Sequence, residues 1–175
     1  MRGRSIGAAV VLAFVVAGTL FRPAPLPAAT RTVSGKVVRV ADGDTLTVVE
    51  RGRAAVNVRL YGIDAPEVRH EETPGQRFGR EARQALRALT LGRRVRVEVV
   101  DVDTHGRVVG LVYESGVDVN RAMVAAGWAW AYRRYLAAPY ASEFIGAERE
   151  ARAKRLGIWT DSNPMPPWEF RRRTR

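Results

Sequence analysis

The sequence predicts an α+β fold, a five-stranded β-barrel with about three α-helices, on the basis of three observations. Five short segments show the alternation and the β-branched residues that are typical of strands. One segment with helical spacing falls between the third and the fourth of them. The chain has 175 residues, which suits one domain of ordinary size. Three strands, a helix and two further strands follow the order of an OB-fold barrel.

The first three strands form a meander. They are predicted at residues 32–40, 45–49 and 56–60. The dipeptides Asp42-Gly43 and Arg51-Gly52 are turn signals between them. The third segment alternates apolar and polar residues, as a half-buried strand requires.

A helix and two more strands follow. The helix is predicted to begin at Thr73-Pro74, with an N-cap residue before a proline at the first helical position. Gly92 suits its end. Its apolar residues recur at helical spacing, namely Phe78, Ala82, Ala85, Leu86 and Leu89. The last two strands are predicted at residues 94–99 and 107–113.

Beyond the barrel the sequence predicts two helices and an extension. A short helix begins at Val119 and ends near Gly127, and a last helix spans residues 141–156. The pair Ile158-Trp159 is expected to fold back on the body. Residues 161–175 form a proline- and arginine-rich extension beyond a domain of residues 30–160.

Residues 1–29 are predicted to be a signal peptide or a signal anchor. Arginines precede an apolar run of 16 residues, 6–21, which is shorter than the roughly 20 residues that usually span a bilayer. Prolines and small residues follow this run, as in a secretory signal. We therefore expect an exported protein, secreted, periplasmic or at the cell surface, and anchored through residues 6–21 if the signal is not cleaved. We expect a monomer.

The amino-acid composition limits which kinds of site and partner the protein can have. The absence of cysteine excludes disulfide scaffolds, thiolate zinc sites, iron–sulfur clusters and a cysteine nucleophile. The formal net charge of +11 favours a polyanionic partner, which is a nucleic acid or an anionic membrane surface. Four of the last five residues are arginine, and we expect this exposed tail to bind phosphates of long nucleic acids without taking part in the chemistry.

Four motifs are candidates for function, and each has an ordinary explanation when taken singly. Asp42-Gly-Asp44-Thr could be a hairpin turn, and Arg59…Asp64-Ala-Pro-Glu67 could be a strand end with a proline stop. Asp103-Thr-His-Gly-Arg107 could be another turn. The aromatic residues 128–135 are at least as typical of a core stripe as of a binding platform.

Together, and in this order, the motifs resemble those of the staphylococcal nuclease (thermonuclease) family of calcium-dependent phosphodiesterases. The resemblance runs from about Val33 to Trp159, and the segment Pro166-Pro-Trp-Glu-Phe is similar to a tail found on many bacterial relatives. It implies an OB-fold nuclease that cleaves DNA and RNA with low sequence specificity and gives 3′-phosphorylated products. The alternative is a non-catalytic OB-fold module that binds nucleic acid by stacking and charge alone.

The resemblance implies a role for each matching residue. Asp44 and Asp64 match carboxylate ligands of Ca²⁺, and Ala65 matches a position whose backbone carbonyl is a ligand. Arg59 and Arg107 match the two catalytic arginines, and Glu67 matches the glutamate that positions or activates the attacking water. Elementary chemistry agrees, because Ca²⁺ prefers oxygen ligands and arginines can clamp the charge of a phosphoryl transition state.

Three points remain open from the sequence. Strict alternation puts Arg59 and Asp64 on opposite strand faces, so a bend at Gly62 is expected to reverse the facing. Tyr132 and Tyr135 match or lie near nucleotide-pocket tyrosines. Thr104 and His105 stand where a family member has a lysine and a tyrosine that hold a terminal phosphate, and an arginine at 133 or 134 is the alternative source of that contact.

Overall fold

The computed structural model describes residues 31–69 and 74–174 of the chain. The predicted signal segment, residues 1–29, therefore lies outside the described residues. Within the described part, no helix is both long enough and apolar enough to cross a membrane.

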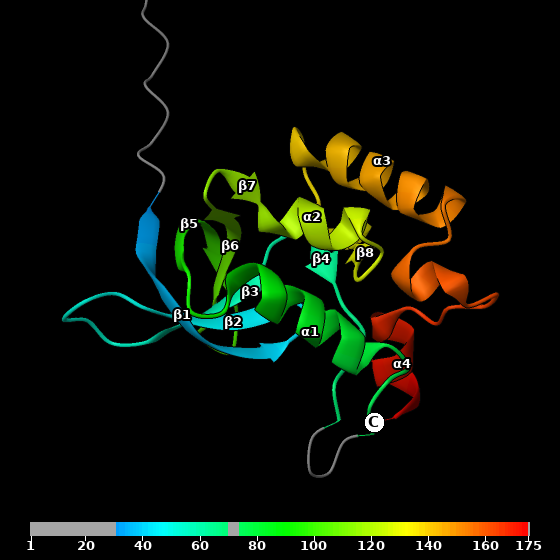
Figure 1. Cartoon of the computed structure of the whole chain (residues 1–175), viewed down its shortest axis with the longest axis horizontal. Coiled ribbons are helices and arrows are strands. Elements are labelled where there is room, and N and C mark those ends of the chain that lie inside the picture. The colour runs from blue at the N-terminus through cyan, green and yellow to red at the C-terminus, as the bar shows by residue number, and fades with distance from the viewer. Residues whose placement is uncertain (1–30, 70–73, 175) are drawn as a thin grey trace, which may run out of the picture.

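Five strands form a closed barrel (Figure 1). They are β1 (Thr32–Asp42), β2 (Thr45–Val49), β3 (Val56–Leu60), β5 (Arg94–Val102) and β6 (Val108–Glu114). The strands pair antiparallel in the order β3-β2-β1-β5-β6, and a parallel pairing of β3 with β6 closes the sheet. The α+β class and the OB-type barrel predicted from the sequence are confirmed.

The barrel can close because β1 bends. Residues 32–36 of this strand pair with β5, and residues 36–42 pair with β2. Val37 and Val40 are both fully buried, although their odd separation would place them on opposite faces of a regular strand. The register shifts after each of them. An extra residue in the ladder reverses the facing and bends the strand.

Four α-helices accompany the barrel in the described residues. They are α1 (Gly79–Thr90), α2 (Val119–Ala125), α3 (Tyr140–Ala153) and α4 (Pro167–Arg173). The first three correspond to the predicted helices, and α3 ends before residue 156, the predicted boundary. The fourth lies in the proline- and arginine-rich extension and was missed. Two 3₁₀ turns, η1 (Arg133–Tyr135) and η2 (Gly157–Thr160), connect these elements.

The predicted start of the first helix was wrong. Pro74 precedes the helix instead of opening it, because α1 begins at Gly79; Thr73 lies outside the described residues. The Gln76 N–H donates to the carbonyl of Glu67 at 2.8 Å, and this bond holds the segment before α1 against Glu67. A Cβ on Gly79 would clash with that same carbonyl oxygen. Tertiary packing of the loop therefore fixes where the helix begins.

Three two-residue strands also escaped prediction, because they are too short to show alternation. They are β4 (Ile63–Asp64), β7 (Val117–Asp118) and β8 (Trp130–Ala131). Strands β4 and β8 pair antiparallel outside the barrel sheet, with Asp64 opposite Trp130. This small ladder places the aromatic segment directly beside Asp64.

A second, aromatic cluster lies apart from the barrel core. Trp130, Ile158 and Trp159 are buried in it, and Trp168 of α4 packs against it. The Trp130 ring centroid lies 5.0 Å from that of Trp159 and 6.4 Å from that of Trp168. The predicted return of Ile158-Trp159 onto the body is confirmed. Trp130 and Trp128 both pack into cores, so the core-stripe interpretation holds for these two tryptophans.

Candidate active site

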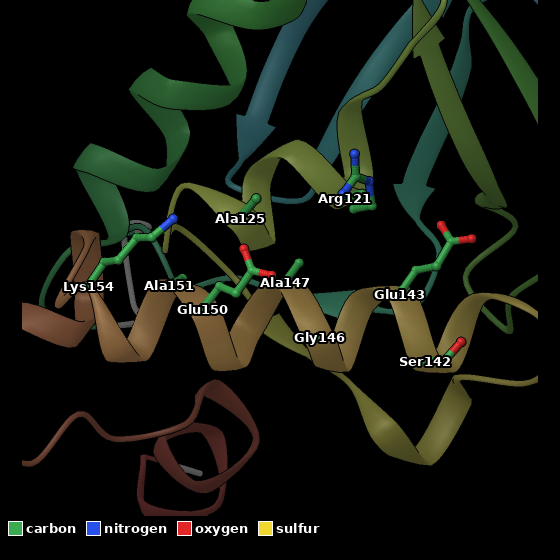
Figure 2. A pocket seen from close by; sticks show the side chains of 9 residues that line it. All are labelled: Arg121, Ala125, Ser142, Glu143, Gly146, Ala147, Glu150, Ala151 and Lys154. Carbon is green, nitrogen blue, oxygen red and sulfur yellow. The ribbon is translucent and has the colours of Figure 1, made fainter.

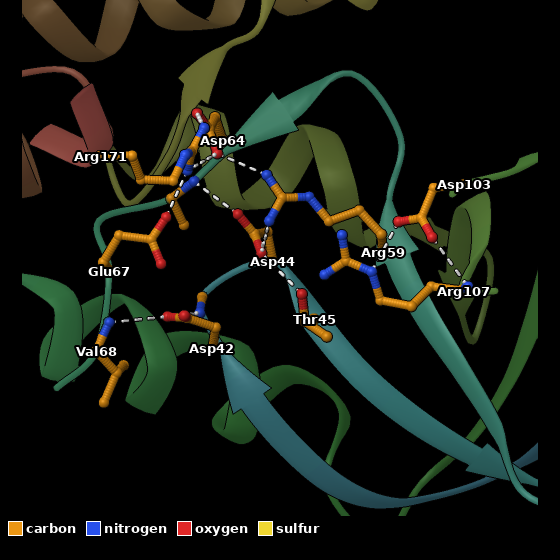
Figure 3. Close-up of polar contacts among 12 residues, drawn as sticks. Asp42, Asp44, Thr45, Arg59, Asp64, Glu67, Val68, Asp103, Arg107 and Arg171 are labelled. Atoms are coloured by element: carbon orange, nitrogen blue, oxygen red, sulfur yellow. Dashed lines mark hydrogen bonds and ion pairs between the residues drawn. The ribbon is translucent and has the colours of Figure 1, made fainter. Parts of the chain in front are cut away.

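The acidic motifs meet at one end of the barrel. Asp44 lies in the β1–β2 turn, Arg59 lies on β3, Asp64 lies on β4, and Glu67 follows β4 (Figure 3). In β3 the neighbours Val58 and Leu60 point into the core, so Arg59 points outward. Four of the residues predicted for the site from two separate motifs are therefore brought together by the fold.

Gly62 makes the meeting of Arg59 and Asp64 possible. Its φ of +72° lies in the left-handed region, between the end of β3 and the start of β4. A Cβ at this position would approach the Leu136 Cδ2 atom to 2.5 Å. Its carbonyl accepts from the Tyr132 N–H at 2.8 Å. The predicted bend is confirmed, and it turns Asp64 to the side of Arg59.

The guanidinium of Arg59 joins the two aspartates. Its Nη1 donates to Asp44 Oδ1 at 2.6 Å, and its Nη2 donates to Asp64 Oδ1 at 2.5 Å. Burial alone would lower the pKa of Arg59, but the carboxylates of Asp44 and Asp64 raise it above its usual value. Arg59 therefore carries a permanent positive charge between two aspartates that are only 2% and 0% exposed.

The second oxygen of Asp44 binds the main chain. Asp44 Oδ2 accepts from the backbone N–H of Ala65 at 2.8 Å, while Oδ1 also accepts from the Thr45 hydroxyl at 3.0 Å. Ala65, predicted to offer its carbonyl, thus lies directly beside the carboxylate with which it is expected to act. The Ala65 carbonyl belongs to the next peptide group and takes no part in this hydrogen bond.

Acidic groups are crowded at this site. Asp42, to which the sequence motifs assign no role beyond the turn, accepts from the Gly43 and Val68 N–H groups at 3.0 and 3.3 Å. Burial, together with the nearby charges of Asp44 and Glu67, raises the pKa of Asp42 to about 8. Burial likewise raises the pKa of Asp64, even though arginines lie against it. The donor set is entirely oxygen, which fits a hard cation such as Ca²⁺ or Mg²⁺.

Arg171 is a further charged group at the site, and the sequence did not predict it there. Arg171 of α4 donates from Nη2 to Asp64 Oδ2 at 2.8 Å and from Nη1 to Asp64 Oδ1 at 3.2 Å. Its Nη1 also donates to Glu67 Oε1. Burial opposes the charge, but the bonds to Asp64 and Glu67 raise the pKa of Arg171 above its usual value. The signal that could have found this helix is Pro167 at its first turn.

Arg107 reaches the same face from the neighbouring strand. Parallel pairing sets Arg59 of β3 opposite Val109 of β6, and Arg107 precedes β6 by one residue. Arg107 is therefore two positions from Val109, which places its side chain on the side of Arg59 (Figure 3). Asp103 holds it there, because its Oδ2 accepts from Arg107 Nε at 2.7 Å.

Asp103 is a further residue that the sequence analysis did not assign. Its Oδ1 accepts from the backbone N–H groups of His105 and Arg107 at 2.9 and 3.0 Å. Burial opposes ionisation, but these bonds and the Arg107 guanidinium together outweigh it and lower the pKa of Asp103. Thr104 and His105 are exposed in this turn. The carboxylate thus shapes the loop that presents Arg107.

A groove continues from the cluster towards the aromatic segment. The Tyr132 and Tyr135 ring centroids lie 5.0 Å apart, edge to face, and Tyr132 stacks on Trp168 at 5.1 Å with an interplanar angle of 3°. The groove has a volume of about 780 Å³. Apart from Ala131, it is lined by aromatic and basic residues, namely Tyr132, Arg133, Arg134, Tyr135, Trp168, Arg171 and Arg172. Both predicted tyrosines lie here, and Trp168 was missed.

A separate hollow lies between α2 and α3 and contains none of the predicted site residues (Figure 2). Its volume is about 570 Å³, and its walls carry charges of both signs, including Arg121, Glu143, Glu150 and Lys154. In the part of the chain that the structure describes, no three or more acidic, histidine or cysteine side chains are grouped as a metal cage. The two aspartates with the Ala65 carbonyl remain the best candidate ligands.

Comparisons with known proteins agree with this geometry. Residues 57–161 match the family model of staphylococcal nuclease homologues. A micrococcal nuclease of Shigella flexneri is 42% identical over 147 residues, covering 79% of this chain and 80% of that protein. An uncharacterized endonuclease of Escherichia coli is 39% identical over 142 residues, covering 81% and 86%. The chain therefore belongs to the staphylococcal nuclease family and is a nuclease, as the sequence motifs predicted.

Proposed function

We propose that this nuclease is a calcium-dependent phosphodiesterase that hydrolyses DNA and RNA with low sequence specificity and leaves 3′-phosphorylated products. The observation that supports it best is the meeting of Asp44 and Asp64 with the guanidinium of Arg59, with Glu67 linked to Asp64 through Arg171 (Figure 3). Arg107 adds a second permanent charge on the same face. Such a combination of carboxylates and arginines serves phosphoryl chemistry, which needs charge stabilisation more than a protein nucleophile.

Asp44, Asp64 and the carbonyl of Ala65 would hold the Ca²⁺ ion. Both side chains are buried and offer only oxygen, and six to eight oxygen ligands suit Ca²⁺, so water and a phosphate oxygen would complete the set. When bound, the ion polarises the phosphate and neutralises part of its negative charge. The crowding of carboxylates around Asp42 favours a cation at this place.

Arg59 and Arg107 would bind the phosphate under attack. A guanidinium offers five N–H donors in a planar fork, so Arg59 can contact a phosphate oxygen while it keeps a bond to an aspartate. Arg107 is anchored through Nε by Asp103, which leaves its terminal Nη groups available for a phosphate. Both arginines would stabilise charge that grows on the phosphoryl oxygens in the transition state.

Glu67 would orient the attacking water and accept its proton at Oε. Its side chain is 20% exposed, so water can reach it, and it lies within reach of the Arg171 that also touches Asp64. The general base is thereby placed next to the site where the phosphate is expected. Cleavage of the bond to the 5′ oxygen leaves the phosphate on the 3′ side, and this outcome is supported by the family resemblance.

Low sequence specificity follows from the chemistry of the groove. Tyrosine and tryptophan rings stack on any base, and arginines bind phosphates that are the same in every sequence. We also propose that residues 1–29 direct export of the enzyme and that the exported form is a monomer. The absence of cysteine is compatible with an oxidising compartment.

Cleavage assays of the purified chain test the proposal. DNA and RNA of mixed sequence should be degraded with Ca²⁺, activity should stop with excess chelator, and the products should be substrates for a 3′-phosphatase. The control is Glu67→Gln, which should still bind nucleic acid. Undiminished cleavage in chelator would exclude the calcium mechanism. Binding without cleavage under all conditions would favour the non-catalytic module.

A further inference from the structure

Both carboxylate oxygens of Asp64 are occupied by arginines. Oδ1 accepts from Arg59 at 2.5 Å and from Arg171 at 3.2 Å, and Oδ2 accepts from Arg171 at 2.8 Å. The Asp64 side chain is 0% exposed, so it has no free face towards solvent. A metal ion that coordinates Asp64 must therefore approach an oxygen that already accepts from a guanidinium group.

Arg171 bridges two groups with different proposed tasks. Its Nη1 binds Glu67 Oε1 while its Nη2 binds Asp64 Oδ2 (Figure 3). The guanidinium thus neutralises the proposed metal ligand and also occupies an oxygen of the group proposed to act on water. A cation at Asp64 and a guanidinium in the same place would repel each other. Arg171 and the metal ion are therefore competitors for this carboxylate.

The two arginines differ in how firmly the fold holds them. Arg59 lies on a barrel strand that pairs with β2 on one side and β6 on the other. Arg171 lies on the short helix α4. This helix packs on the rest of the molecule partly through Trp168, which stacks on Tyr132. Its guanidinium also lines the groove of about 780 Å³, where it has space to turn. A seven-residue helix is only marginally stable by itself, so Arg171 is the arginine that can leave.

We propose that Arg171 is a displaceable counter-ion of the active site, which holds Asp64 and Glu67 in the metal-free chain and leaves Asp64 when Ca²⁺ binds. The inference rests on the proposed function, because it takes Asp64 as a metal ligand. The C-terminal helix then sets how much Ca²⁺ the enzyme needs. Glu67 becomes available for water in the same event, so the extension keeps the site inactive at low Ca²⁺ concentration.

Calorimetric titration with Ca²⁺ alone, in the absence of nucleic acid, measures the competition. Arg171→Gln should tighten Ca²⁺ binding about tenfold or more, which corresponds to the loss of one charge-assisted hydrogen bond to Asp64. Arg172→Gln is the matched control, because within the described residues it lines the same groove and makes no hydrogen bond to a carboxylate. Its dissociation constant should equal that of the wild type. An unchanged or weaker affinity in Arg171→Gln would overturn the proposal.

A measurement on the unmodified chain guards against misfolding of the variant. Hydrogen exchange of the amides of α4 should become faster when Ca²⁺ is added, since the helix loses its anchor at Asp64. Exchange of β3 amides should not become faster. If α4 exchanges equally or more slowly with Ca²⁺, Arg171 stays in place and the proposal fails.

The two proposals can fail separately. If the wild-type chain cleaves nucleic acid only with Ca²⁺ but Arg171→Gln binds the ion no more tightly, the calcium mechanism stands and the counter-ion proposal is wrong. If the wild-type chain binds no Ca²⁺ in the titration and cleaves without it, the proposed function itself is wrong.

Discussion

Arg59 and Arg171 bind the same carboxylate from two regions of very different construction. Arg59 belongs to the barrel, where strand pairing on both sides fixes its backbone. Arg171 belongs to a seven-residue helix near the end of the chain and is 32% exposed, against 20% for Arg59. A charge on a rigid strand can be aimed at a transition state, whereas a charge on a short helix can be exchanged. The predictions below test this contrast, beginning with the largest effect.

Arg59→Ala should be the most damaging change. Turnover should fall about 10³-fold or more, the range for arginines that stabilise phosphoryl transition states. The metal-free variant should also lose about 3 kcal/mol or more of stability, because Asp44 and Asp64 would be left as buried charges with fewer partners. Steady-state kinetics and urea unfolding measure both effects. Arg94→Ala, at an exposed position of β5, is the control. If Arg59→Ala unfolded at the same urea concentration as the wild type, the predicted loss of stability would be wrong.

Glu67→Gln separates chemistry from folding. Turnover should fall about 10²–10⁴-fold, the usual contribution of a general base, while affinity for nucleic acid stays near that of the wild type. The amide keeps the shape of the side chain and can still accept from Arg171. Single-turnover kinetics and fluorescence anisotropy measure the two quantities. Glu81→Gln, on the first turn of α1, serves as the control. Normal turnover in the Glu67 variant would remove this residue from the reaction.

Gly62→Ala tests whether the bend assembles the barrel side of the site. The alanine Cβ would meet the side chain of Leu136 and would have to adopt a positive φ, so stability should fall by about 1–3 kcal/mol. Gly52→Ala shares the positive φ but has open space around it, and it should lose less. Thermal unfolding of both variants checks this difference. Equal losses would show that close packing at Gly62 does not matter.

Arg172→Gln probes the extension as a surface for nucleic acid. The prediction that all arginines of residues 171–175 only bind long nucleic acid has to be revised, because Arg171 contacts Asp64 and Glu67. Arg172 lines the groove and should contribute about one unit to the slope of log affinity against log salt. Binding titrations with Glu67→Gln as background, from low to moderate salt, measure this slope. An unchanged slope would show that the bound nucleic acid does not contact Arg172.

Asp103→Asn should have the smallest effect and is best seen through pH. The folded pKa of Asp103 is lowered, so its contribution to stability is present above its unfolded pKa of about 3.9 and is lost as the pH falls through the folded value. The wild type should therefore be more stable than Asp103→Asn at pH 7, and this difference should disappear in strong acid. Melting temperatures at pH 7 and pH 2 check it. Turnover should fall modestly, as Arg107 loses its anchor.

Much of the site was predictable because its parts are local in sequence. Asp44 is placed by the Asp42-Gly43 turn, and the bend at Gly62 could be expected from the odd separation of Arg59 and Asp64. Asp103 holds Arg107 from four residues away, but its carboxylate is a turn residue like many others, and no spacing rule distinguished it. Trp168 lay in a segment whose prolines suggested an extended chain, although proline also suits the first turn of a helix.

The sequence by itself determined the barrel, the order of its strands and the identity of the motif residues, because alternation, turn residues and short motifs are written in neighbouring positions. Only the tertiary structure decided where α1 begins, that β4 pairs with β8, and that Arg171 reaches Asp64 across 107 residues of chain. Such contacts depend on how whole elements pack and on which charges meet in a buried place. No local pattern encodes the distance between two segments, so a terminal arginine looks the same in sequence whether it faces water or the active site.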